Sequence, residues 1–233
     1  MDYMLLIVNR RDEAPRESIG FAEMGKFAAE LGQQGKLRSG APLLPDNVAA
    51  RVTQRSGKTH VVDGPFAETK EVIGGYFMFD ARDAAEALEI AKRCPAARSG
   101  RVQLHLAMAD RVDPAPEGAT RFMLVFLEGP DFDGDPDGAK YRQMVRWTDA
   151  LKREKKYVEC AGLAKSPPGA SIEIDGAKTT VTDGPFAEAK EVVGGYALVV
   201  APDRRAALEI AARCPHAAWG EVEVREVMKV PAM

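Results

Sequence analysis

Asp63-Gly-Pro-Phe-Ala-Glu-Thr-Lys-Glu71 occurs twice in this chain, the second time as Asp183-Gly-Pro-Phe-Ala-Glu-Ala-Lys-Glu191. The copies lie 120 residues apart, and the 14 positions that begin at Asp63 are identical at 12. A repeat of this quality indicates two copies of one structural unit. We therefore predict a first domain over 1–110, a linker over 111–120 and a second domain over 121–230.

Both repeats show the same series of apolar patterns. Strands are expected over 3–8 and 122–127, and each is followed by a helix with apolar residues at helical spacing, over 21–31 and 141–151. An extended stretch (36–44; 157–164), a hairpin, a strand that follows a glycine pair, a second helix and a last strand complete each unit. Asp83 and Asp203 are the expected N-caps of the second helices. The order β-α-β-β-β-α-β is a ferredoxin-like pattern with an extra hairpin strand.

An open antiparallel sheet of this kind leaves a face or an edge that needs cover. Two copies on one chain can cover each other around a pseudo-twofold axis. The expected fold class is therefore α+β, with two tandem ferredoxin-like units that form an intrachain pseudo-dimeric α+β barrel. Two domains that move independently on a linker are the alternative.

The composition limits the partners and the compartment. The 233 residues are 45% hydrophobic and 29% charged, with a formal net charge of −3, so no basic field attracts nucleic acid or anionic lipid. No apolar run is long enough for a membrane span. Three cysteines without an export signal favour reduced thiols and a cytoplasmic protein.

The repeated motif carries the candidate chemistry. Asp63 and Glu68, with Asp183 and Glu188 in the second copy, are the candidate catalytic carboxylates, and Lys70 and Lys190 are candidate anion-binding residues. Tyr76 and Tyr196 follow the glycine pairs and could point their hydroxyl groups into a pocket. The alternative is a purely structural role. The motif would then form a turn with strict conformational requirements, its charged residues would form surface ion pairs, and the tyrosines would pack in the core.

Comparison of the two copies argues against histidine, metal or nucleotide-binding chemistry at a site that both copies share. None of the three histidines recurs, because His60, His105 and His216 stand opposite Thr180, Arg225 and Ala96. No spacing resembles a metal site, and no loop resembles a nucleotide-binding motif, so neither a metal nor a cofactor is expected. Cys94 and Cys214 do recur, and we interpret them as buried core residues.

The motif, followed by Gly-Gly-Tyr, a strand, an Ala-rich helix and a proline, resembles the DGPF branch of the YCII-related proteins. The resemblance covers nearly the whole chain. It implies a ferredoxin-like dimeric α+β barrel, usually assembled from two separate chains. Here the fusion would supply both halves, as a monomer with an internal pseudo-dimer or as a homodimer of it.

The resemblance implies little about the reaction. The simpler YCII-type proteins are proposed to use a histidine on the first helix with a nearby aspartate, and one relative is a dehydrochlorinase that acts on a halogenated hydroquinone. The best matching helix positions here hold Met24 and Met144, so that dyad is missing, and Asp63 and Asp183 match its acidic partner loosely. Proteins of the branch are often encoded near extracytoplasmic-function sigma factors, which implies a regulatory or stress context.

Three hypotheses for the function remain open at this point. A binding protein would hold a small aromatic or organic-acid molecule in a cleft between or within the repeats. A cofactor-independent lyase or isomerase would use the carboxylates for proton transfer. A protein-interaction module would use sheet edges or an exposed helix face, and the fold alone does not choose among the three.

Overall fold

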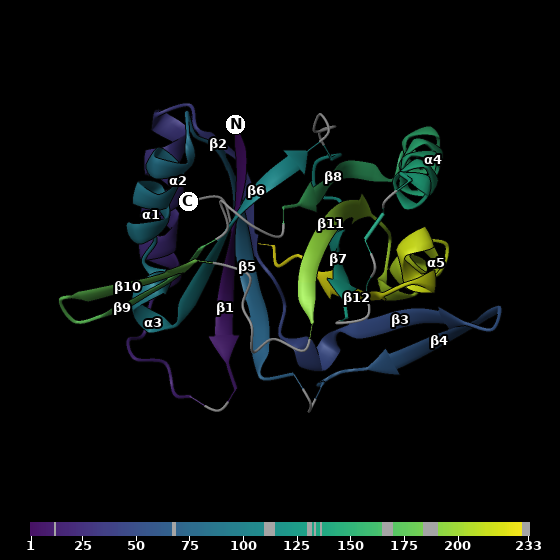
Figure 1. Cartoon of the computed structure of the whole chain (residues 1–233), viewed down its shortest axis with the longest axis horizontal. Coiled ribbons are helices and arrows are strands. Elements are labelled where there is room, and N and C mark those ends of the chain that lie inside the picture. Colours follow the sequence, from purple (N-terminus) through teal and green to yellow (C-terminus); the bar gives the residue numbers. More distant parts are fainter. Residues whose placement is uncertain are drawn as a thin grey trace.

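The computed structural model describes residues 1–11, 13–66, 69–109, 115–129, 132, 134–135, 137–164, 170–183 and 191–229, without the side chain of Asp183 (Figure 1). The first repeat contains β1 (Asp2–Arg10), α1 (Phe21–Gln33), β2 (Leu37–Pro42), the 3-10 turn η1 (Asp46–Val48), β3 (Ala50–Arg55), β4 (Lys58–Asp63), β5 (Glu71–Asp80), α2 (Ala84–Lys92), α3 (Ala96–Ser99) and β6 (Arg101–Ala109). The second contains β7 (Arg121–Glu128), α4 (Ala139–Arg153), β8 (Tyr157–Leu163), β9 (Ala170–Asp175), β10 (Lys178–Asp183), β11 (Val192–Val200), α5 (Arg204–Ala212), the 3-10 turn η2 (Pro215–Ala218) and β12 (Glu221–Glu226).

The α+β fold predicted from the repeat is confirmed, with one correction to the strand order. Four strands, not three, lie between the helices of each repeat. The extended stretch and the hairpin are separate elements because they pair with different strands: β2 pairs with β5, whereas β3 pairs with β4 and β12.

Within the described residues, eight strands form a closed antiparallel ring in the order β2-β5-β1-β6-β8-β11-β7-β12. Pairing of β6 with β8 makes one junction between the repeats, for example at Ala107 and Leu163. The equivalent junction at the other side is the isolated bridge between Leu43 and Val227, supported by the bond from Leu44 N to Glu226 O at 2.9 Å. The alternative of two independent domains is therefore wrong, since one barrel contains strands of both.

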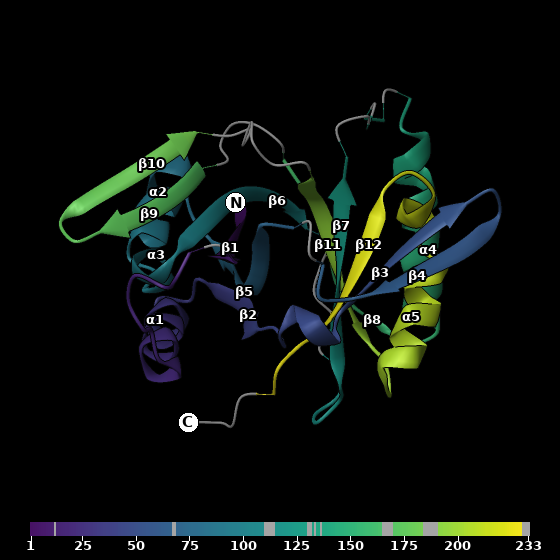
Figure 2. The ribbon, with the colours of Figure 1, turned by 90° about the horizontal axis from the view of Figure 1, so that it is seen from below.

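The two hairpins are exchanged between the repeats. Strand β9 of the second repeat pairs with β6 of the first, where Ser171 lies opposite Gln103. Strand β3 of the first repeat pairs with β12 of the second, where Arg51 lies opposite Glu223. Figures 1 and 2 show the result: β9 lies beside α2 and α3 of the first repeat, and β3 lies beside α5 of the second.

Alternation along the strands divides the core into three layers. In β1, Tyr3 and Leu5 face the helices of the first repeat, and Met4 and Leu6 face the barrel interior. A matching cluster lies under the helices of the second repeat. The predicted N-caps are confirmed, because Asp83 accepts a bond from Glu86 N at 2.9 Å and Asp203 accepts one from Ala206 N at 2.8 Å. Cys94 and Cys214 are buried, as predicted, and burial raises the pKa of the Cys94 thiol to about 12.

Candidate functional site

Two charged residues of the first copy of the motif, Asp63 and Lys70, lie on the surface. Asp63 ends strand β4, its side chain is 73% exposed, and it forms an ion pair with Arg204 at the start of α5 in the other repeat. Lys70 is exposed, and its backbone oxygen accepts a bond from Arg11 N at 2.9 Å. Glu68, Glu188, Lys190 and the side chain of Asp183 lie outside the described residues, so their predicted roles stay predictions.

The Gly-Pro-Phe part of the motif builds a tightly packed turn in the first copy. A Cβ atom on Gly64 would collide with the backbone oxygen of Asp46, so only glycine fits there. Phe66 is 9% exposed, and the guanidinium of Arg51 lies over its ring at 4.3 Å from the centroid. The turn therefore supports Arg51, which crosses from the first repeat into the second.

The last glutamate of the motif binds an arginine in both repeats. Glu71 pairs with Arg101 of β6 at 2.7 Å. Glu191 pairs with Arg51 of β3 at 3.0 Å, and Arg51 also contacts Glu223 at 3.0 Å and Glu221 at 3.3 Å. The retained glutamate thus anchors the junction with the exchanged hairpin, although the two arginines stand at different positions of the repeat.

The glycine pairs allow β5 and β11 to bulge before the tyrosines. A Cβ on Gly75 would lie 2.9 Å from Ala41 O, and one on Gly195 would lie 2.6 Å from Ala161 O, the equivalent atom of the other repeat. The pairing register shifts between Ile7 and Val8 on one side and between Val193 and Gly195 on the other. A bulge re-aims the next side chains of its strand. The glycines therefore direct Tyr76 and Tyr196 into the barrel.

Tyr76 and Tyr196 meet in the barrel interior. Both are 0% exposed, and their ring centroids lie 6.2 Å apart at an interplanar angle of 39°. Beside them lies Glu159 of β8, also 0% exposed, which accepts a bond from the Ser39 hydroxyl on Oε2 at 3.2 Å. We call Tyr76, Tyr196, Glu159 and Ser39 the barrel cluster.

The barrel cluster contains polar atoms that lack well-formed hydrogen bonds. The Oη atoms of Tyr76 and Tyr196 and the Oε1 atom of Glu159 are buried and make no hydrogen bond of normal geometry with the described residues, although Tyr196 lies close enough to interact with Glu159 and Tyr76 close enough to interact with Ser39. A buried polar group without a partner costs about 1–3 kcal/mol. Three such atoms in one cluster therefore mark a place where a ligand or ordered water would complete the bonding.

Burial dominates the electrostatics of the cluster. It raises the pKa of Glu159, and the nearby Tyr196, Ser39 and Arg38 offset part of this effect. Burial and the neighbouring Glu159 carboxylate also raise the pKa of both tyrosines. The cluster lies one layer below solvent, since Arg38 and its ion-pair partner Asp2 have side chains that are 21% and 23% exposed.

Sequence reasoning found the two tyrosines and missed Glu159 and Ser39. These two residues occupy equivalent positions of the repeats. The available signal was a single carboxylate within the largely apolar stretch that becomes β8, at a position that faces the barrel. Because the first copy holds serine there, a comparison restricted to retained residues passes over it.

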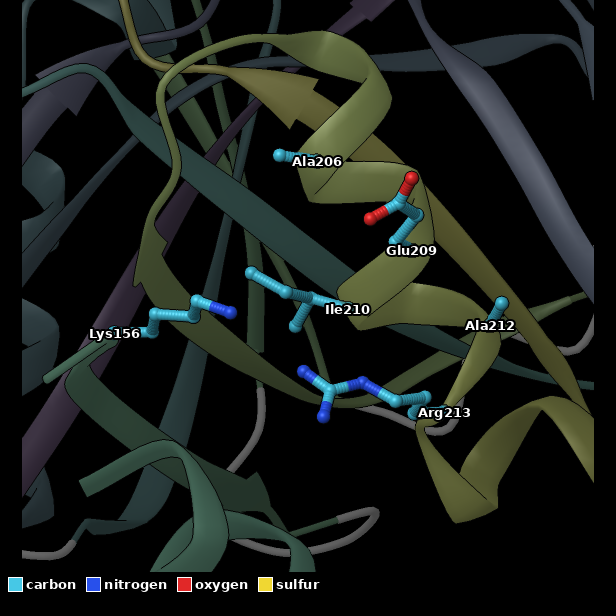
Figure 3. Close-up of a pocket in the computed structure, with 6 residues that line it drawn as sticks. All are labelled: Lys156, Ala206, Glu209, Ile210, Ala212 and Arg213. Carbon is cyan, nitrogen blue, oxygen red and sulfur yellow. The ribbon is translucent and has the colours of Figure 1, made fainter. Parts of the chain in front are cut away.

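A hollow lies on the surface beside α5, away from the barrel cluster. Its volume is about 440 Å³, and Figure 3 shows the lining by Lys156, Ala206, Glu209, Ile210, Ala212 and Arg213. Both cations are already neutralised, because Glu154 binds Lys156 at 2.8 Å and Arg213 at 2.9 and 3.0 Å. These pairs hold the pKa of Glu154 at about 2. An anion would have to displace Glu154, so the barrel cluster is the better candidate site.

Two further structural findings concern metals and membranes. In the part of the chain that the structure describes, no group of three or more His, Cys, Asp or Glu side chains is placed to hold a metal ion. Among the same residues, no helix has the length and apolarity needed to cross a membrane.

Comparison with known proteins identifies the family. The model of the YCII-related domain matches residues 1–105 and again residues 120–231. The chain belongs to the YCII-related family. An uncharacterized protein of Rhizobium meliloti (strain 1021) is 43% identical over 60 residues, which are 26% of this chain and 48% of that protein, so the alignment spans about half of the relative's length.

Among solved structures, the chain is similar to a crystal structure described as that of a candidate chlorite dismutase. The two are 8% identical with a TM-score of 0.35, and the match covers 98% of this chain and 94% of the other. No conclusion about this YCII-related protein rests on that likeness.

Proposed function

We propose that this YCII-related protein binds a small molecule at the barrel cluster between its two repeats. The observation that carries the proposal is the buried polar cluster of Tyr76, Tyr196 and Glu159, three of whose oxygen atoms lack hydrogen bonds of normal geometry. A site with a few convergent polar groups in an apolar surrounding is typical of small-molecule binding. The ligand class remains the small aromatic or organic-acid molecule expected from the sequence.

We also propose that Glu159 is the proton-transfer group of this site. Its burial in the barrel and its raised pKa are the properties of a carboxyl group tuned for acid–base chemistry. Asp63, by contrast, is exposed and paired with Arg204. The reaction would be that of a cofactor-independent lyase or isomerase. Membership of the DGPF branch is part of the proposal and is supported by the two copies of the motif.

The proposal is tested by thermal shift with a library of small aromatic and organic acids. Ligands that bind the native state raise the melting temperature. The double variant Tyr76→Phe/Tyr196→Phe should lose the shift and stay folded, because it keeps both buried rings and removes only hydroxyl groups that make no hydrogen bond of normal geometry. The control Tyr141→Phe changes a tyrosine that is 69% exposed and should keep the shift. A library without hits, or a double variant that responds as the wild type does, would contradict the proposal.

A second candidate is a non-catalytic interaction module in a sigma-factor or stress pathway. Strand β4 supports it, because all six of its residues are exposed and it ends the order of paired strands. Val61 and Val62 on this strand are 48% and 59% exposed. An unpaired edge can accept a strand from another protein. Val62→Lys would abolish capture of such a partner and leave a ligand-induced thermal shift unchanged.

A further inference from the structure

A histidine near the end of the second repeat makes two hydrogen bonds that fix its protonation. His216 of η2 is 5% exposed, and its Nε2 atom lies 3.0 Å from the backbone oxygen of Leu127 in β7. Its Nδ1 atom lies 3.1 Å from Nε1 of Trp219. A carbonyl oxygen only accepts and an indole N–H only donates, so Nε2 carries the hydrogen and Nδ1 does not. Both bonds therefore require the neutral imidazole.

The packing around His216 holds the ring in this orientation. It stacks on Phe126 with the ring centroids 5.1 Å apart, and the Trp219 ring meets it edge-on with the centroids 6.0 Å apart. A Cβ atom on Gly220 would collide with His216 Nε2 and with Leu127 O, so the chain approaches this hydrogen bond as closely as glycine allows. The ring is thus fixed between η2 and β7.

Burial and neighbouring charges both act on His216. Burial lowers its pKa from the ordinary value of 6.5, the bond to Leu127 and the Glu128 carboxylate of β7 offset part of this effect, and Lys140 of α4 adds to it. The Nζ atom of Lys140 also lies over the Trp219 ring, 5.9 Å from the centroid. Strands β3 and β12 pack against η2 as well, and among their charged groups Arg51 pairs with Glu221 and Glu223, and Arg225 pairs with Glu223.

The first repeat forms a comparable helical turn without this pair. Ala96 and Ser99 of α3 stand 120 residues before His216 and Trp219, at the equivalent positions. There the Ser99 hydroxyl donates to the backbone oxygen of Ala96 at 3.2 Å. The fold therefore does not require histidine and tryptophan at this place, and the pair adds a property that the first repeat lacks.

We propose that His216 and Trp219 form an acid-sensitive lock between η2, β7 and the first turn of α4. At neutral pH the lock is closed, with the Trp219 indole bound to Nδ1. When Nδ1 takes up a proton from solvent, its N–H faces the indole N–H, so the hydrogen bond is lost. The new charge also repels Lys140, and Trp219 moves away from the imidazole. This inference is independent of the proposed function at the barrel cluster.

The direction of the pH dependence follows from burial. In the open form His216 is exposed to water and binds the proton with the ordinary pKa, whereas in the closed form it binds the proton less readily. As pH falls below about 6.5, the preference for the closed form should fall about tenfold per pH unit, until the pH reaches the lowered pKa of the closed form. Above about pH 7.5 the lock should stay closed.

The test follows the indole N–H of Trp219 in the full chain by NMR. The chain holds two tryptophans, so isotope-labelled tryptophan gives two indole signals, and Trp219→Phe identifies the signal of Trp219. Between about pH 7.5 and about pH 4, this signal should move to the position of a solvent-exposed indole with a midpoint below about 6.5. Trp147, buried in the core of the second repeat, should not respond, and far-UV circular dichroism should stay constant. At neutral pH, labelled histidine should show His216 Nδ1 without a hydrogen.

Three variants separate the lock from other effects of acid. His216→Ala introduces the residue of the first repeat and should remove the pH response of the Trp219 signal. His60→Ala removes an exposed histidine of β4 and should keep that response. The double variant His216→Ala/Trp219→Ser should fold, and its melting temperature should approach that of the wild type as pH falls, because acid removes the contribution of the lock from the wild type alone.

Four results would overturn the inference. They are a Trp219 signal that does not respond to pH, a response that persists in His216→Ala, a hydrogen on Nδ1 at neutral pH, and loss of the circular dichroism signal at the same pH as the indole change. The last result would mean that acid unfolds the whole chain rather than opening this contact.

Discussion

At the scale of single residues, Glu159 is a carboxyl group in an unusual environment. It has no exposed surface, and its Oε1 atom makes no hydrogen bond of normal geometry with the described residues. Because burial raises its pKa, the native state holds a proton that the unfolded chain releases at lower pH. This difference makes the stability of the protein depend on pH.

The wild type should lose stability relative to Glu159→Gln as pH rises from the ordinary pKa of a glutamate to the raised value of the folded state. Below that window both states hold the proton, and the two proteins should be equally stable. Above it the wild type should melt at a lower temperature than the variant, because ionisation of the buried carboxyl group opposes folding. Melting curves of both proteins from about pH 4 to about pH 8 measure this difference. A difference that does not change with pH would show that Glu159 ionises as an exposed glutamate does.

At the scale of elements, the repeats provide matched pairs. Helix α1 is followed by Gly35 with φ of +66°, and helix α4 is followed by Lys155 with φ of +56°. Both residues stand in the left-handed conformation at the helix C-terminus, which glycine adopts most easily. The second repeat therefore has a lysine, which is unfavourable in this conformation, at the position where the first repeat has a glycine.

Lys155→Gly should stabilise the protein by about 0.5–1 kcal/mol. An L-residue in this conformation costs about 1–2 kcal/mol, and the greater backbone entropy of glycine in the unfolded chain returns part of that gain. The reverse change Gly35→Lys, at the equivalent position, should destabilise by a similar amount. Urea unfolding of the two variants gives both values. Destabilisation by Lys155→Gly would mean that the Lys155 side chain makes contacts that outweigh the backbone strain.

At the scale of the whole molecule, the exchanged hairpins join the repeats through charged groups. Arg51 of the first repeat contacts Glu191, Glu221 and Glu223 of the second, and its side chain is 12% exposed. Arg225, 1% exposed, binds the other oxygen of Glu223 at 3.1 Å. The network is largely shielded from water, so removal of one member leaves charges without compensation.

Arg51→Met should therefore destabilise the whole protein by about 2–4 kcal/mol. The matched control is Arg205→Met, which removes an exposed pair with Glu209, with side chains 89% and 66% exposed, and should change stability little. Denaturant midpoints of both variants provide the comparison. Equal midpoints would show that the Arg51 network adds nothing to the junction.

The sequence predicted the fold well and the site in part, for identifiable reasons. Strands, helices and the caps at Asp83 and Asp203 follow from local patterns, and the duplication predicted the shared barrel. The extra strand was missed because the number of strands depends on which strand each segment pairs with, and pairing is a property of the folded chain. The tyrosines were found because they follow glycines that both copies retain. Glu159 was missed because its importance comes from burial between the repeats.

The sequence by itself determined that this protein is a duplicated α+β unit, since the repeat and its apolar periodicity are local properties of the chain. Only the tertiary structure decided where the side chains of the repeated motif and of its neighbours lie. It placed Asp63 on the surface against Arg204, exchanged the hairpins between the repeats, and brought Tyr76, Tyr196 and Glu159 together. The physical reason is that these contacts form between strands that meet only when the barrel closes, and burial in that barrel gives Glu159 its altered chemistry.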